Sequence, residues 1–172
     1  MSKVFGLGLS RTGTTTFSEV LKPHLNIIHY PRTRTIYDSQ NDGSCDIPVI
    51  PEYKKLDERY KDAKFVLTVR DIDAWTVSVT NYFERKRQKN PNQVAWQADI
   101  RKKVYGKLFP TPEEFRQTYL NHYDDVVQHF DGREDKLLIL NIVGGDSPEK
   151  LFSFLGINNP PSEFPLTNKA KK

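Results

Sequence analysis

Apolar residues in this chain form short runs, and the longer segments between those runs carry apolar residues at helical spacing. Short runs predict strands at residues 3–7, 26–30, 64–69 and 137–140. The runs at 64–69 and 137–140 are almost wholly apolar, which favours buried strands. Helices are predicted at residues 14–21, 51–60, 74–88, 93–108, 111–130 and 147–155. Residues 32–48 are rich in Thr, Asp, Ser and Gly and predict a loop.

Two helix starts have the residues of an N-terminal cap. Thr111 is followed by a proline and two glutamates, which is typical of a capped first turn. Ser147 is followed by Pro148 and Glu149 and predicts a second capped helix, which Gly156 would end.

Strands that alternate with helices predict an α/β fold, a three-layer sandwich in which helices cover both faces of a small parallel sheet. We expect residues 1–172 to form a single domain. Ligands of such folds bind beyond the carboxyl ends of the strands. The segments that follow Leu7 and Val69 should therefore lie on one rim of the sheet.

Composition narrows the class of protein. Hydrophobic residues make up 37% and charged residues 28%, as in an ordinary globular protein. The net charge of +4 suits a polyanionic small ligand but is too small to demand nucleic acid. No apolar run approaches the roughly 20 residues that span a bilayer, and the first residues lack a signal-peptide pattern. Cys45 is the single cysteine, which is typical of a protein from a reducing compartment, and we expect a cytoplasmic protein. From the charge and the apolar runs we expect no nucleic-acid or membrane partner.

The segment Gly8–Thr15 has the spacing of a phosphate-binding P-loop with one departure. Thr14 stands where G-x-x-x-x-G-K-[ST] has its lysine, and the cation is inside the loop at Arg11. Backbone N–H groups of such a loop and the start of the next helix bind anions. The hydroxyls of Thr14, Thr15 and Thr16 add donors.

Three other interpretations of this segment stay open. A Mg²⁺-dependent P-loop kinase or NTPase is disfavoured by the missing lysine and by Arg70, which follows the strand at 64–69 where a metal-holding acid would be needed. A dinucleotide site would place Arg11 at its third glycine, and no acid ends the second strand. The segment could also be a glycine turn without a ligand.

Two motifs resemble those of the P-loop sulfotransferases. Arg11-Thr12-Gly13-Thr14-Thr15 matches the [KR]-x-G-T-T loop of that family, and Arg70 is followed eight residues later by Ser78, as in its 3′-phosphate motif. Residues 137–156 are similar to the family's last strand and helix.

The resemblance implies a nucleotide-kinase-like fold and a metal-free transfer of a sulfuryl group from 3′-phosphoadenosine 5′-phosphosulfate (PAPS) to a hydroxyl or amine. The product of the donor would be 3′,5′-bisphosphoadenosine (PAP). The residues expected to bind the donor are Ser10, Arg11, Thr12, Gly13, Thr14, Thr15, Thr16, Arg70 and Ser78.

Two residues are candidates for the base that takes the acceptor's proton. Asp46, in Cys45-Asp46-Ile47-Pro48, stands where cytosolic sulfotransferases have a catalytic histidine, although it could instead cap a turn. His29, at the end of the second strand, is the alternative, and it could be structural. The family's lysine near the base has no counterpart, so Arg11 would carry the positive charge at the leaving oxygen.

The acceptor is expected to be a small molecule or a glycan. Residues 32–46 and 83–109 would line its site, and the basic tail 168–172 could cover the nucleotide or be solvated. A non-catalytic nucleotide-binding module remains an alternative to the enzyme. The sequence is silent on oligomeric state.

Overall fold

The computed structural model describes residues 2–89 and 94–165, and the basic tail at 168–172 lies outside them. Five strands form one parallel sheet in the order β2-β3-β1-β4-β5. Their bounds are β1 Val4–Gly6, β2 Ile27–His29, β3 Gly43–Cys45, β4 Lys64–Thr68 and β5 Leu137–Leu140. The predicted α/β fold with a small parallel sheet is confirmed.

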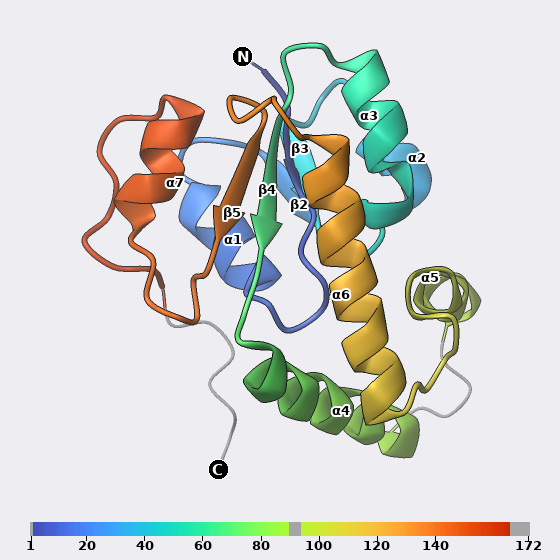
Figure 1. Cartoon of the computed structure of the whole chain (residues 1–172). Helices are drawn as coiled ribbons and strands as arrows, with labels where there is room; N and C mark the ends of the chain where they lie inside the picture. Colours follow the sequence, from blue (N-terminus) through green and yellow to red (C-terminus); the bar gives the residue numbers. More distant parts are fainter. Residues whose placement is uncertain (1, 90–93, 166–172) are drawn as a thin grey trace.

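Helices and strands alternate along the chain, except that α4, α5 and α6 follow one another between β4 and β5 (Figure 1). The helices are α1 Thr14–Leu21, α2 Thr33–Ile36, α3 Tyr53–Arg59, α4 Ile72–Lys89, α5 Ala95–Tyr105, α6 Pro112–His129 and α7 Pro148–Leu155. A short 3₁₀ turn, Ile50–Glu52, leads into α3. None of the helices in the described part of the chain is both long enough and apolar enough to cross a bilayer.

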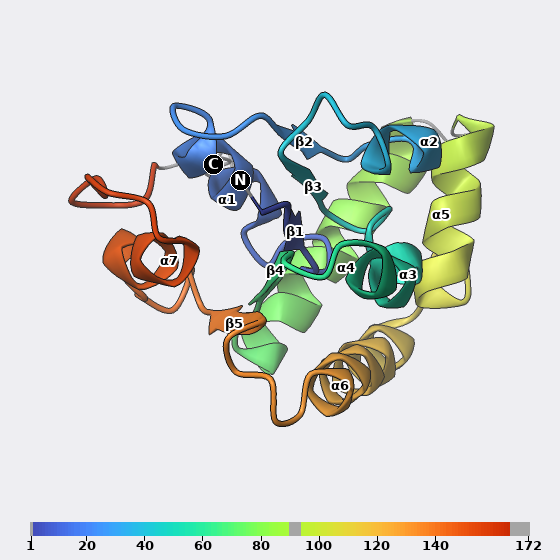
Figure 2. The same cartoon turned by 90° about the horizontal axis from the view of Figure 1, so that it is seen from above.

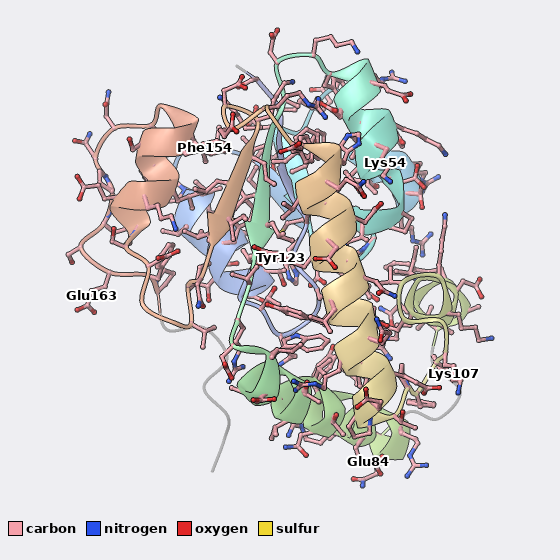
Figure 3. All side chains as sticks on the ribbon, viewed as in Figure 1. Lys54, Glu84, Lys107, Tyr123, Phe154 and Glu163 are labelled. Carbon is pink, nitrogen blue, oxygen red and sulfur yellow. The ribbon has the colours of Figure 1, made fainter. Side chains whose placement is uncertain are left out.

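Helices lie on both sides of the sheet, so the sandwich has three layers (Figure 2). Because successive strand residues point to opposite faces, Val4 and Val66 pack in a cluster with α1 and α7, while Phe5 and Phe65 pack in another with α3 and α6. In Figure 3, Phe154 and Tyr123 extend toward the sheet from these two sides.

A third apolar cluster lies beyond the carboxyl ends of the strands. There α4 crosses below the sheet, as Figure 1 shows, and packs against α5 and α6. The buried members of this cluster are Leu9, Ile47, Trp75, Val79, Phe83, Tyr105 and Phe115. The cluster forms a floor beneath the rim where a ligand of an α/β fold is expected.

The prediction of a loop over residues 32–48 is wrong, because the segment contains α2 and the interior strand β3. The sequence Gly43-Ser44-Cys45 has no apolar periodicity. It forms a strand because it pairs with β1 and β2 in the folded protein. A Cβ atom at Gly43 would lie 1.8 Å from the Val4 carbonyl oxygen, so β3 can approach β1 this closely only with glycine there.

Most predicted boundaries are confirmed, with two corrections. Thr111 caps α6 through its side chain and forms a reciprocal capping box with Glu114, and Gly156 ends α7 at a φ of 67°. Ser147 precedes α7 but makes no side-chain capping bond. Strand β5 is half-buried rather than buried, because it lies at the edge of the sheet.

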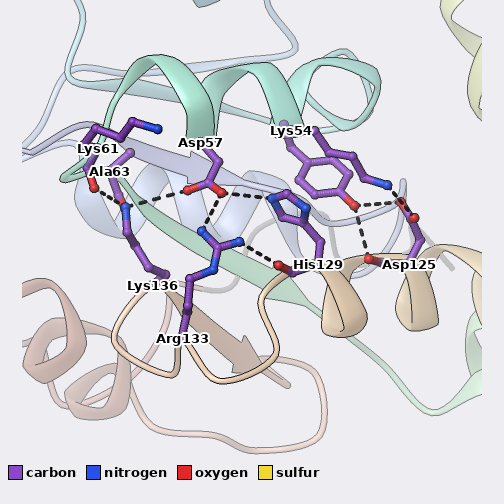
Figure 4. A network of polar contacts seen from close by, with 9 residues as sticks. Lys54, Asp57, Lys61, Ala63, Asp125, His129, Arg133 and Lys136 are labelled. Carbon is purple, nitrogen blue, oxygen red and sulfur yellow. Dashed lines mark hydrogen bonds and ion pairs between the residues drawn. The ribbon is translucent and has the colours of Figure 1, made fainter.

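At the far end of the sheet from this rim, Asp57 of α3 joins α3 to the end of α6 (Figure 4). Its Oδ2 atom accepts a hydrogen bond from Arg133 at 2.7 Å and lies 3.0 Å from His129 Nε2. Lys136 Nζ is 3.7 Å from the other carboxylate oxygen. Burial alone would raise the pKa of Asp57, but the bonds from Arg133 and His129 outweigh it and lower the pKa below its ordinary value.

We predict that Asp57→Asn lowers the free energy of unfolding at pH 7 by about 2 kcal/mol, because three donors lose a buried anion. Since the folded pKa is lowered, this contribution is present above the unfolded pKa of about 4 and is lost as pH falls through the folded value. Urea unfolding at several pH values should show the difference between wild type and Asp57→Asn shrinking below pH 4. Asp131→Asn, at an exposed residue, serves as the control. A difference that persists unchanged in acid would contradict this account.

Candidate functional site

A cavity of about 600 Å³ opens at the carboxyl ends of the strands. It is lined by Ser10, Arg11, Gly13, Thr14, Thr15, Thr16, His29, Tyr30, Asp46, Arg70, Ser78, Tyr82, Lys86, Gln97, Arg101 and Val143. With the exception of Thr12, every candidate residue from the sequence lines this cavity. Strands β1 and β4 are neighbours and parallel, so the segments that follow them meet at the rim as predicted.

The loop between β1 and α1 presents an uncapped helix start to the cavity. Arg11 and Gly13 have φ angles of 75° and 108°, and Gly13 occupies the N-cap of α1 without a side-chain capping bond. The backbone N–H groups of Gly13, Thr14 and Thr15 precede the first complete turn, so α1 offers them no carbonyl. This geometry is typical of a binding site for a phosphate or sulfate group.

Thr12 points into the protein instead of the cavity. Its hydroxyl donates to the Leu9 carbonyl at 2.8 Å and lies 2.7 Å from the hydroxyl of Thr68 at the end of β4. A Cβ atom at Gly8 would lie 1.8 Å from that Thr68 hydroxyl. Gly8 is therefore needed for packing of the loop against β4, and Thr12 anchors the loop.

Two aromatic side chains hold the loop through its Ser10 backbone. The Trp75 indole N–H of α4 donates to the Ser10 carbonyl at 2.9 Å, and the Ser10 N–H donates to the Tyr105 hydroxyl of α5 at 3.0 Å. All of these partners are buried. The hydrogen bond from Trp75 to the loop could not be predicted from the sequence.

Arg70 is fixed by its backbone while its side chain faces the cavity. The Tyr119 hydroxyl donates to the Arg70 carbonyl at 2.7 Å and accepts from the Arg70 N–H at 3.1 Å. Asp71 accepts from the Ala74 N–H at the start of α4. Asp73 pairs with Arg116.

The nearby acids are thus occupied elsewhere. Within residues 2–89 and 94–165, the buried Arg70 Nε atom has no hydrogen-bond partner and Arg70 forms no ion pair. Arg11 Nε lies 3.4 Å from Ser78 Oγ, which brings the loop and the start of α4 together at the same cavity.

His29 and Asp46 form a pair because their strands are neighbours. His29 ends β2 and is in register with Cys45, the last residue of β3, so Asp46 follows directly beside it. His29 Nε2 lies 2.9 Å from Asp46 Oδ2, and Thr14 donates to the same oxygen at 3.0 Å. Asp46 Oδ1 accepts from the Ile47 N–H, and Asp46 has a φ of 82°. Asp46 therefore both shapes the turn and faces the cavity.

Apart from Ser78 and the broad range 83–109, the sequence did not single out the residues of the far wall of the cavity. Ser78, Tyr82 and Lys86 are four residues apart and form one stripe on α4, while Gln97 and Arg101 do the same on α5. The i, i+4, i+8 spacing that begins at Ser78 was the available signal. Nothing in the sequence marked Arg101 as buried.

The cavity is strongly cationic. Burial and the neighbouring guanidinium of Arg85 lower the pKa of Arg11, which remains a cation. Burial raises the pKa of Tyr30 to about 12, even though Arg101 acts in the opposite direction. No group of three or more His, Cys, Asp or Glu side chains suited to a metal ion occurs in the described residues.

Comparison with known proteins identifies the family. A family model described as a sulfotransferase domain matches residues 32–172. The chain belongs to the sulfotransferase domain family. It is therefore an enzyme of the sulfuryl-transfer class, and the comparisons give no support to a kinase or NTPase.

Two solved structures with the same fold are sulfotransferases. One, from Alicyclobacillus acidocaldarius, has a TM-score of 0.58 and 12% identity over 97% of this chain and 87% of the other. Mouse sulfotransferase SULT7A1, complexed with PAP, has a TM-score of 0.57 and 17% identity over 94% of this chain and 60% of its own. No significant match was found among curated proteins.

We predict that Trp75→Phe and Tyr105→Phe each lower the free energy of unfolding of this sulfotransferase by about 1–2 kcal/mol, because each leaves a buried Ser10 backbone group without its partner. Urea unfolding monitored by circular dichroism measures the effect. Tyr60→Phe is the matched control, since the half-buried Tyr60 hydroxyl reaches the Tyr37 carbonyl only at 3.5 Å. An equal decrease in the free energy of unfolding in all three variants would show that the hydrogen bonds to Ser10 contribute no more than the weak Tyr60 contact.

Proposed function

We propose that this sulfotransferase uses PAPS as its donor, acts as a single domain, and transfers the sulfuryl group to a hydroxyl or amine of a small molecule or glycan. The proposal rests on the meeting of two groups of residues suited to anions, the loop at residues 8–15 and the pair Arg70 and Ser78. Arg11 Nε of the loop lies 3.4 Å from Ser78 Oγ, and Arg70 lines the same cavity. The mouse structure complexed with PAP supports a donor of this kind.

The 5′ end of the donor fits the loop at the start of α1. The N–H groups of Gly13, Thr14 and Thr15 and the positive end of α1 suit the 5′-phosphosulfate. During transfer, the acceptor oxygen or nitrogen forms a bond to sulfur while the bond from sulfur to the bridging oxygen breaks. Negative charge then develops on the 5′-phosphate of PAP, and Arg11 stabilises it.

The 3′-phosphate fits the corner formed by Arg70 and Ser78. A guanidinium can donate two parallel hydrogen bonds to a phosphate, and the buried Arg70 Nε has no other partner among the described residues. Ser78 is two helical turns further along and reaches the same cavity. Binding of the 3′-phosphate would release Ser78 from its contact with Arg11.

The Asp46–His29 pair fits the role of proton acceptor. His29 Nε2 and Asp46 Oδ2 lie 2.9 Å apart, so a proton taken from the acceptor group would be stabilised by both members. Thr14 and the Ile47 N–H orient the carboxylate. The pair also lies beside the loop that would hold the sulfuryl group, and this proximity supports its assignment as the base.

We predict that Arg70→Ala and Ser78→Ala weaken PAP binding by about 10- to 100-fold, because charge-assisted bonds to the 3′-phosphate are lost. Binding of adenosine 5′-phosphate, which lacks this phosphate, should change by less than about threefold. Titration calorimetry with both nucleotides measures the contrast. Equal losses for the two nucleotides would refute the assignment of the 3′ corner.

We predict that Asp46→Asn and His29→Ala each lower kcat by about 10²–10⁴-fold, the usual contribution of a general base. PAP affinity should change little, because neither side chain is assigned to the nucleotide. Transfer of radioactive sulfate from labelled PAPS to a set of phenols, sugars and amines measures kcat. If both variants turn over like the wild type, the pair is not the base.

A further inference from the structure

Two cationic side chains that line the cavity have no role in donor binding as proposed above. Among its described lining residues, the cavity has four cations, Arg11, Arg70, Lys86 and Arg101, and one carboxylate, Asp46. Arg11 and Arg70 suit the phosphosulfate and the 3′-phosphate. Lys86 lies eight residues beyond Ser78 on α4, about 12 Å along the helix axis. It is therefore well removed from the 3′ corner.

Arg101 is held rigidly at the cavity wall. Only 4% of its surface is exposed, and its guanidinium carbon lies 4.9 Å from the centre of the Phe83 ring. Its charge acts on Tyr30 and Tyr82, which both line the cavity. A buried arginine is costly to hold in an apolar protein interior. Because Arg101 lines the cavity, an anion bound there would offset part of that cost.

The same wall lies close to the base. Tyr30 follows His29 directly, and its N–H donates to the carbonyl of Cys45, the residue before Asp46. Across the cavity, Lys86 Nζ lies 5.5 Å from the centre of the Tyr82 ring, and the Arg11 guanidinium carbon lies 5.6 Å from the same ring. Lys86 and Arg11 thus approach the same aromatic ring.

We propose that Arg101, with Lys86 at the rim, forms an acceptor subsite that binds an anionic group, so that the acceptor of this sulfotransferase carries a carboxylate, sulfate or phosphate in addition to the reacting hydroxyl or amine. The inference rests on the proposed function, because it takes the donor to occupy the Arg11 and Arg70 corners. Tyr30, Tyr82 and Gln97 line the same cavity as this subsite and the Asp46–His29 pair.

Binding in the presence of saturating PAP tests the subsite without requiring turnover. The probes are 4-hydroxyphenylacetate and 4-hydroxybenzenesulfonate, compared with the neutral 4-hydroxyphenylacetamide, and calorimetry gives each Kd. We expect at least one anionic probe to bind wild type about tenfold more tightly than the amide, as charge-assisted hydrogen bonds provide. Arg101→Gln should abolish this preference, and Lys86→Gln should reduce it a few-fold.

Matched controls separate the subsite from general charge. Lys102→Gln on α5 and Lys89→Gln on α4 remove exposed charges that do not line the cavity and should leave the preference unchanged. Glu84, which Figure 3 shows pointing away from the sheet, marks the outer side of α4. Thermal melting checks the fold of Arg101→Gln, and the exposed Lys86 provides a test even if that variant misfolds.

Several results would overturn the proposal. They are equal binding of the anionic and neutral probes, failure of both anionic probes to bind, and a preference that Lys86→Gln and folded Arg101→Gln both retain. A large loss of PAP affinity in Arg101→Gln would instead assign Arg101 to the donor, which also overturns it. In each of these cases wild type still binds PAP; failure of wild type to bind PAP would contradict the proposed function itself.

Discussion

The site depends on the fixed position of one short loop, residues 8–13, between β1 and α1. Its backbone is bonded at Ser10 by Trp75 and Tyr105, and its Thr12 hydroxyl contacts Thr68. These contacts come from α4, α5 and β4, so the loop can hold its shape only when all three elements are assembled. Arg11 and the start of α1 then face the cavity without help from a ligand, which is what preorganised anion binding requires.

The parallel sheet brings this loop together with the other residues of the site. Strands that run in one direction end at one rim, and the order β2-β3-β1-β4-β5 brings His29, Asp46, the loop and Arg70 to that rim in turn. Four segments widely separated in the sequence therefore contribute to a single cavity. The floor formed by α4 and its apolar cluster closes the cavity from below.

Much of this arrangement could be predicted, and the failures have physical causes. The glycine loop and the Arg70 and Ser78 spacing are local patterns, so they could be located from the sequence alone. Strand β3 could not, because its pairing depends on the close approach of Gly43 to β1 and on no periodicity of its own. Missing β3 also hid the reason that Asp46 lies beside His29. Arg101 reaches the cavity only through the packing of α5 against α4 and α6, which no local pattern encodes.

The central claim is that one nucleotide bridges the loop at residues 8–15 and the corner formed by Arg70 and Ser78. A crystal structure of the protein with PAP tests it most directly. The account predicts the 5′-phosphate within hydrogen-bond distance of the Gly13, Thr14 and Thr15 N–H groups, and the 3′-phosphate at Arg70 and Ser78. A nucleotide bound with its 3′-phosphate in solvent, or outside this cavity, would contradict the account.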